Sequence, residues 1–200
     1  MTQQQMPWLP SGSSQIAYYA QARGFLYAAK PSEDWFVAWE PHDTMVSPEL
    51  WFNACTERSR GRTFVVAEPW TTGEGLDPLE RTIVGFAQIG AGPTRRAAMR
   101  VGEPFMTKVA FLEQAPPPQV KLGDKVWDEH VTTFAASPAE AAAAFPRQLR
   151  ELLRGRGFRG HLEIRPGGFV VHHEGWGPRP ESYDTMFRVL HDIARALTSG

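Results

Sequence analysis

The chain has a single cysteine, Cys55, among its 200 residues. One thiol cannot form an internal disulfide, so the small disulfide-stapled secreted domains are excluded. The first ten residues lack the basic and apolar regions of a signal peptide. No stretch approaches the roughly 20 apolar residues that cross a bilayer. We therefore expect a cytoplasmic protein without a membrane span.

A large excess of charge of either sign is also lacking. Lys and Arg number 21 against 22 Asp and Glu, which gives a net charge of −1 at neutral pH. The global charge therefore gives no reason to expect a nucleic acid or an anionic membrane as partner. Hydrophobic residues make up 42% and charged residues 22%, which is ordinary for a globular protein and argues against disorder.

The common catalytic and phosphate-binding motifs are missing as well. The sequence contains neither the phosphate loop G-x-x-x-x-G-K-[ST] nor the serine hydrolase elbow G-x-S-x-G. No cysteine hydrolase signature surrounds Cys55, so a buried and inert thiol is expected there. We expect no catalytic residue and no bound cofactor, and these absences favour a non-enzymatic protein.

The apolar pattern and the turn residues predict one α+β domain over 13–200, after a flexible tail over 1–12. Its sheet should be rich in antiparallel pairs, with about four helices packed on it. Prolines within 115–119 divide this domain into two possible lobes. The predicted strands cover 34–40, 62–68, 81–89, 95–100, 105–112, 125–134, 161–165 and 169–173. The predicted helices cover 48–58, 147–154 and 181–197, with two more that begin after a Ser cap at Ser13 or Ser14 and at Ser137.

The second half of the chain resembles a bacterial family of unknown function. The residues that carry the resemblance are Gly123, Asp124, Trp127, Asp128, Phe134, Pro146, Leu149, Leu152, Leu162 and Ile164, together with the strand start Gly61-Arg62-Thr63. The usual members of that family are membrane-associated through spans near the N-terminus. The resemblance implies a Leu-rich helix, a two-stranded hairpin and a closing helix, and it implies no activity and no catalytic residue.

Two local clusters could hold a metal ion or act as a hydrolase site. One is His172-His173-Glu174 and the other is Asp128-Glu129-His130. Imidazole and carboxylate groups are ligands of zinc and other divalent metals. Neighbouring residues of a regular strand point to opposite faces, so His172 and His173 cannot both bind one ion there. A metal-dependent or His/Asp-based hydrolase that uses His130, His172, His173 and Asp128 is the alternative hypothesis.

Arginines and aromatic residues are the other candidates for function. The basic run contains Arg147, Arg150, Arg154, Arg156, Arg159 and Arg165, opposed by Glu151 and Glu163. Nucleic-acid binding through this run is a third hypothesis, although its spacing favours the solvated face of an amphipathic helix. Because Trp and Arg are preferred anchors of protein interfaces, we favour a protein-interaction or adaptor module of a bacterial cytoplasm. Its expected interaction residues are Trp176, Phe169, Arg156, Arg159 and Arg165. The partner would be another protein, and the oligomeric state is left open.

Overall fold

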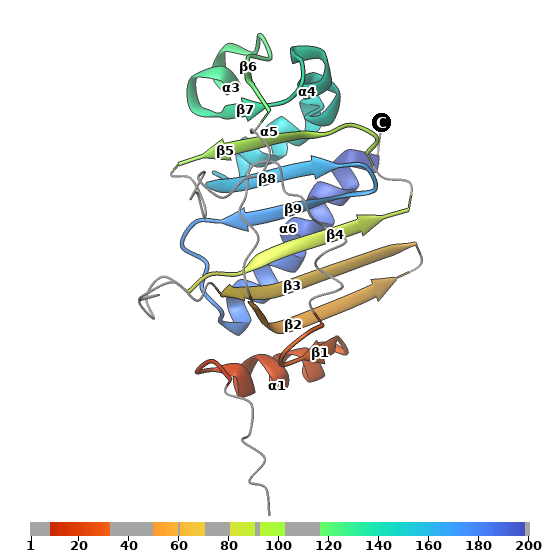
Figure 1. Cartoon of the computed structure of the whole chain (residues 1–200), viewed down its shortest axis with the longest axis vertical. Helices are drawn as coiled ribbons and strands as arrows, with labels where there is room; N and C mark the ends of the chain where they lie inside the picture. The colour runs from red at the N-terminus through yellow and green to blue at the C-terminus, as the bar shows by residue number, and fades with distance from the viewer. Residues whose placement is uncertain are drawn as a thin grey trace, which may run out of the picture.

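The computed structural model describes residues 9–32, 50–59, 61–70, 81–90, 93–102 and 117–198. Within these ranges one antiparallel sheet contains nine strands, in the order β1-β2-β3-β4-β9-β8-β5-β7-β6 (Figure 1). The strands are β1 (Leu26–Ala28), β2 (Leu50–Ser59), β3 (Arg62–Trp70), β4 (Val84–Ile89), β5 (Ala97–Val101), β6 (Gln119–Val120), β7 (Thr132–Phe134), β8 (Gly160–Arg165) and β9 (Gly168–His173). The helices are α1 (Ser13–Arg23), α3 (Lys125–His130), α4 (Pro138–Ala144), α5 (Arg147–Gly155) and α6 (Pro180–Thr198).

Helices α5 and α6 lie on the same face of the sheet, behind the strands as drawn in Figure 1. Helix α6 crosses β3 and β4, and its buried stripe includes Tyr183, Met186 and Leu190. At Gly85 in β4 a side-chain carbon would lie 3.0 Å from both Met186 and Leu190, so the helix approaches the strand closely there. Helices packed on an antiparallel sheet confirm the predicted α+β class.

A smaller apolar cluster lies on the opposite face of the sheet. Its buried members come from β2, β3, β4 and β9, and they are Trp51, Ala54, Val65, Ala67, Val84, Phe86 and Val170. The central strands therefore bury both faces. Their sequences are nearly continuous apolar runs without alternation, as expected for strands that are covered on both sides.

The hairpin of β8 and β9 and the Ser137 cap of α4 confirm the sequence prediction. The Ser137 hydroxyl accepts a hydrogen bond from the backbone N–H of Glu140, with Pro138 at the first helical position. Strand β4 forms within the predicted range 81–89, and β5 overlaps the predicted range 95–100 and ends one residue later, at Val101. They are not neighbours, because the hairpin lies between them in the sheet.

Three local predictions are wrong. The segment predicted as a helix over 48–58 forms strand β2 from Leu50 onward, because it pairs with β1 and β3. The segment predicted as a strand over 125–134 begins as helix α3, since the Asp124 side chain caps it by accepting from the N–H of Trp127, and only Thr132–Phe134 forms a strand, β7. Helix α1 is capped by Gly12 at φ 86°, with no side-chain cap from serine.

The remaining predictions concern segments that lie outside the described residues or next to them. The strands predicted over 34–40 and 105–112 lie outside the described residues. Within the predicted tail, the carbonyl of Pro10 accepts a hydrogen bond from Ser13, and the carbonyl of Ser11 accepts one from Arg81. The chain is therefore held to the domain from Pro10 onward. One sheet contains strands from both sides of 115–119.

Candidate functional site

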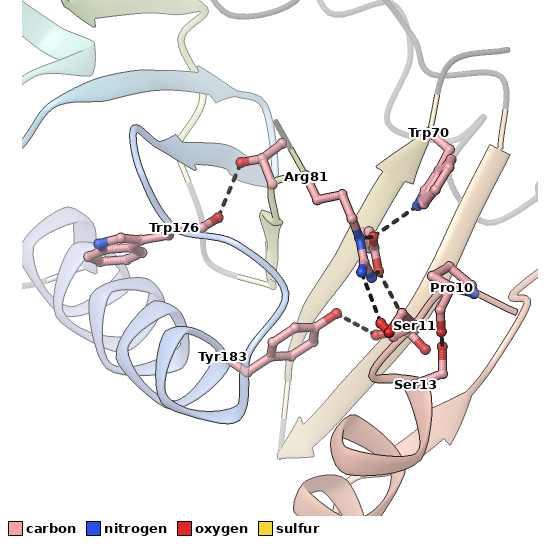
Figure 2. A network of polar contacts seen from close by, with 10 residues as sticks. Pro10, Ser11, Ser13, Trp70, Arg81, Trp176 and Tyr183 are labelled. Carbon is pink, nitrogen blue, oxygen red and sulfur yellow. Dashed lines mark hydrogen bonds and ion pairs between the residues drawn. The ribbon is translucent and has the colours of Figure 1, made fainter. Parts of the chain in front are cut away.

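A buried ion pair between Glu68 and Arg81 joins several elements at one end of the sheet (Figure 2). The Glu68 carboxylate is fully buried and accepts from Nε of Arg81 at 2.6 Å and from Nη2 at 3.0 Å. It also accepts from Nε1 of Trp70 at 2.9 Å and from Nδ2 of Asn53 at 2.8 Å. Four donors occupy the two oxygens, so the carboxylate has no lone pair left for a proton transfer.

Asn53 connects this pair to strand β1 and helix α6. Its φ of 51° is left-handed and coincides with a register shift between β2 and β3, which marks a bulge. Its side-chain oxygen accepts from the Tyr27 hydroxyl at 2.8 Å, and its carbonyl accepts from the Tyr183 hydroxyl at 2.9 Å (Figure 2 labels Tyr183). The carboxylate, guanidinium, amide, indole and hydroxyl groups of this network all have hydrogen-bond partners. The network therefore stabilises the domain and is not a candidate catalytic site.

The structure separates the residues of the metal hypothesis. His172 is buried, and its Nε2 lies 2.9 Å from Oγ1 of Thr82. His173 stacks on the Trp176 ring at a centroid distance of 3.8 Å, and His130 is exposed at the end of α3. Within the described ranges no three His, Cys, Asp or Glu residues lie close enough to hold a metal ion.

The pKa values of His172 and Cys55 do not suit acid–base or nucleophilic chemistry near neutral pH. Burial lowers the pKa of His172 to about 3, so its ring is neutral. The Thr82 hydroxyl donates to the carbonyl of Trp176 at 3.3 Å, so the His172 ring donates to Thr82. The Asp128 carboxylate accepts from the backbone N–H groups of Leu122 and Gly123, at 3.0 and 2.9 Å. Burial raises the pKa of the Cys55 thiol to about 12, which fits the expected inert cysteine.

The aromatic residues predicted to bind a partner lie in different environments. Phe169 is fully buried in β9, so its side chain is not available to a partner, contrary to the prediction. An inward-facing position on a central strand explains this, because Phe169 packs in the core between sheet and helices. Trp176 is half-buried, and it packs on the core as well as on His173.

The arginine run is largely neutralised by carboxylates of the same chain. The ion pairs are Arg147–Glu151, Arg150–Asp124, Arg156–Asp192 and Arg159–Glu174. Arg165 is half-buried. A basic surface that tracks a phosphate backbone needs cations that are not already paired, so these contacts argue against the nucleic-acid hypothesis.

Arg154 differs from its neighbours in the run. It is exposed, and it makes no ion pair with any residue of the described chain. It lines the mouth of a cavity with a volume of about 210 Å³, together with His130. The apolar wall of the cavity comes from α3, α5, β5 and the segment after α5, and it includes Met99, Val101, Val126, Trp127, Leu153 and Phe158. An apolar cavity with a few polar groups at its mouth is the usual form of a binding site, so this is the candidate functional site.

The cavity is supported by buried contacts beneath it. Nε1 of Trp127 donates to Oγ1 of Thr133 at 2.9 Å, and the Trp127 ring lies 5.8 Å from the ring of Phe145. Asp124 holds α3 on one side by capping it and pairs with Arg150 of α5 on the other. The sequence identified Trp127 and Arg154 only as members of longer sets, because their meeting depends on a helix that was predicted as a strand.

The segment from Gly155 to Gly160 matches the spacing G-x-G-x-x-G, which the sequence candidates did not include. In dinucleotide sites this spacing connects a strand to the N-terminus of a helix. Here it connects the C-terminus of α5 to β8, so a strand and not a helix follows it along the chain. The order of the elements is the reverse of the fingerprint, so the match does not indicate a dinucleotide site.

Comparison with known proteins gives one structural likeness to report. No family model matches the sequence, and no curated protein matches it. Among solved structures, the chain is similar to the crystal structure of the mycobacterial trehalose monomycolate transport factor A, TtfA, with a TM-score of 0.66. The likeness covers 94% of this chain and 96% of that chain at 14% sequence identity. At this identity the likeness shows the fold. No helix in the described ranges combines the length and the apolar character that a membrane crossing requires.

Proposed function

We propose that this chain is a non-enzymatic factor in lipid transport and that it acts by binding another protein. The single observation that carries the proposal is the likeness to TtfA, a trehalose monomycolate transport factor, over 94% of this chain and 96% of that one. Fold alone does not determine function. The likeness nevertheless covers nearly the whole of both chains, so little of either chain lies outside the matched residues.

The state of the reactive side chains supports a role without catalysis. Three of the groups that the sequence suggested for chemistry are not free to react: His172 and Cys55 are buried, and the Asp128 carboxylate accepts from two backbone N–H groups. An enzyme needs a nucleophile or a base that reaches substrate with a matched pKa. The pKa of about 3 for His172 and of about 12 for Cys55 lie far from neutral pH.

The size of the candidate cavity supports binding a protein over carrying a lipid. Sites that enclose a drug-sized molecule have volumes of about 300–1,000 Å³. The cavity beside Arg154 has a volume of about 210 Å³, which is too small for a long-chain glycolipid. Protein interfaces instead depend on one or two side chains that fill small pockets. We place this function in the bacterial cytoplasm, the compartment expected from the sequence.

The test is depletion of the chain in its source organism, followed by pulse labelling of envelope lipids with radioactive acetate. Surface-extractable and cell-retained lipids are then compared by thin-layer chromatography. We expect a labelled glycolipid to accumulate in the cell-retained fraction, and re-expression of the chain to restore the distribution. An unchanged distribution, with depletion verified by immunoblot, contradicts a role in lipid transport. The control is re-expression of Arg147→Glu, which alters an exposed arginine away from the cavity wall.

A further inference from the structure

Resting on the proposed function, we propose that the cavity between α3, α5 and the end of β5 docks the protein partner by accepting one large apolar side chain from an acidic segment. The occupant is a stretch of polypeptide in which a Phe, Leu or similar side chain has Asp or Glu neighbours. Arg154 at the mouth would pair with those carboxylates, and the apolar wall would cover the inserted side chain.

The volume of the cavity fits a single side chain. A dry apolar cavity of roughly 150 Å³ in another protein is large enough to admit benzene. The cavity here has a volume of about 210 Å³, so it accommodates one phenyl or isobutyl group with room for its attachment to the backbone. Its deeper wall is formed by side chains that are nearly inaccessible to solvent, such as Met99 and Leu153. A partner that fills it would exclude the remaining water, as the central residues of interfaces do.

The rim of the cavity offers apolar surface to a partner. Val126 on α3 is 49% exposed and also lines the cavity, so apolar surface continues from the cavity to the outside. The described chain exposes few other large apolar side chains, namely Leu9, Tyr18 and Leu26, which belong to α1, β1 or the residues before them. In Figure 1 those elements lie at the opposite end of the sheet from α3.

The charge at the cavity indicates the charge of the partner segment. Arg147, Arg150 and Arg156 on and beside α5 are each paired with a carboxylate of this chain. Arg154 makes no ion pair in the described ranges, and the carboxylate that feels its charge, Asp124, is already paired with Arg150. An exposed and unpaired cation beside an apolar cavity attracts an anion that approaches with the apolar group. None of the residues that line the cavity is acidic. The complementary segment is therefore acidic as well as apolar.

The test is photo-crosslinking in cells that express the full chain, with p-benzoylphenylalanine in place of Val126. The matched control carries the same group in place of Tyr18, which is 74% exposed on α1. We expect a protein adduct from position 126 and none of the same mass from position 18. Mass spectrometry of the adduct should map to a partner peptide in which a large apolar residue has Asp or Glu neighbours.

Two variants link the adduct to the cavity. Arg154→Glu reverses the charge at the mouth and should lower the adduct yield about fivefold or more. Arg147→Glu changes the same helix away from the cavity and should leave the yield unchanged. Val131→Phe narrows the cavity, because Val131 lines it, and should lower the yield while circular dichroism shows an intact fold.

Several outcomes would overturn the docking proposal. They are the absence of any adduct at position 126, an adduct with a lipid and no peptide, a mapped peptide that is basic, and a yield that Arg154→Glu leaves unchanged. These are separable from failure of the proposed function. If depletion changes the lipid distribution while position 126 gives no adduct, the transport role stands and the docking site is wrong. If position 126 behaves as expected while depletion changes nothing, the docking site stands and the transport role is wrong.

Discussion

Replacing Glu68 with Gln tests whether the buried ion pair with Arg81 stabilises the fold. The carboxylate accepts four hydrogen bonds between 2.6 and 3.0 Å. Glutamine keeps one oxygen as an acceptor. Its NH₂ group takes the place of the other oxygen and would face two donors, from which it cannot accept. Asn53 can rotate its own amide and accept, because the Tyr27 hydroxyl can accept as well as donate. Arg81 can only donate, so it loses its hydrogen bond to the oxygen that the amide replaces, and its charge is left without a counterion.

The magnitude follows from the burial of the two partners. Removing one partner of a buried pair costs about 3–5 kcal/mol, because the other charge stays desolvated. The Arg81 side chain keeps 15% exposure, so water relieves part of this cost. Glu68→Gln should therefore lower the free energy of unfolding by about 3 kcal/mol. The Glu68 side chain has 0% exposure, so Arg81→Met should cost more, about 4 kcal/mol.

Urea unfolding followed by tryptophan fluorescence measures both variants. With a slope of about 2 kcal/mol per molar urea, Glu68→Gln should lower the midpoint by about 1.5 M. Glu151→Gln is the control, because it removes the carboxylate of an exposed pair and should leave the midpoint unchanged. A shift below about 0.5 M for Glu68→Gln, or a smaller loss for Arg81→Met than for Glu68→Gln, would refute the reasoning.

Three further predictions concern single side chains. Burial holds the pKa of His172 at about 3, below its usual value of 6.5, so the unfolded chain binds a proton between these values that the folded chain does not. Stability should therefore fall as pH drops below 6.5, by up to about 1.4 kcal/mol per pH unit from this group, and His172→Gln should flatten urea midpoints measured from pH 7.5 to 5.5. Ser137→Ala removes the cap of α4 and should cost about 1 kcal/mol in the same assay, whereas Ser137→Asp should retain most of it. Cys55 should resist a disulfide reagent at pH 8 in native buffer and react at once in urea, because burial raises its pKa to about 12; rapid native labelling would contradict its placement in the core.

The parts of the fold that the sequence predicted are those in which local signals agree with the tertiary structure. The capping box at Ser137 and the apolar stripe of α6 need no distant partner to be recognised. The prediction was wrong for strand β2, because the bulge at Asn53 breaks the alternation of buried and exposed residues in it. Buried residues then follow one another from Trp51 to Cys55, in a pattern that does not distinguish a strand from a helix.

The candidate site was less accessible to sequence reasoning. Lys125 to Phe134 contains β-branched and aromatic residues that favour a strand, yet Asp124 and Asp128 bond to nearby backbone N–H groups and stabilise a short helix. Placing Val126 and Trp127 on that helix is what brings them to Arg154. Which arginine stays unpaired depends on carboxylates such as Asp192, distant in sequence, so composition alone could not single out Arg154.

The position of the β8–β9 hairpin in the sheet determines when the protein can fold during its synthesis. Strand β4 pairs with β9, and β5 pairs with β8, so in the described sheet the two groups of earlier strands join through residues 160–173. A ribosome releases those residues after the other strands of the described ranges have emerged. Until then β4 and β5 each present an open edge, which is a template for pairing with other chains. Nascent chains stalled before Gly160 should therefore require chaperones, and completion of the hairpin should commit the sheet to its native order.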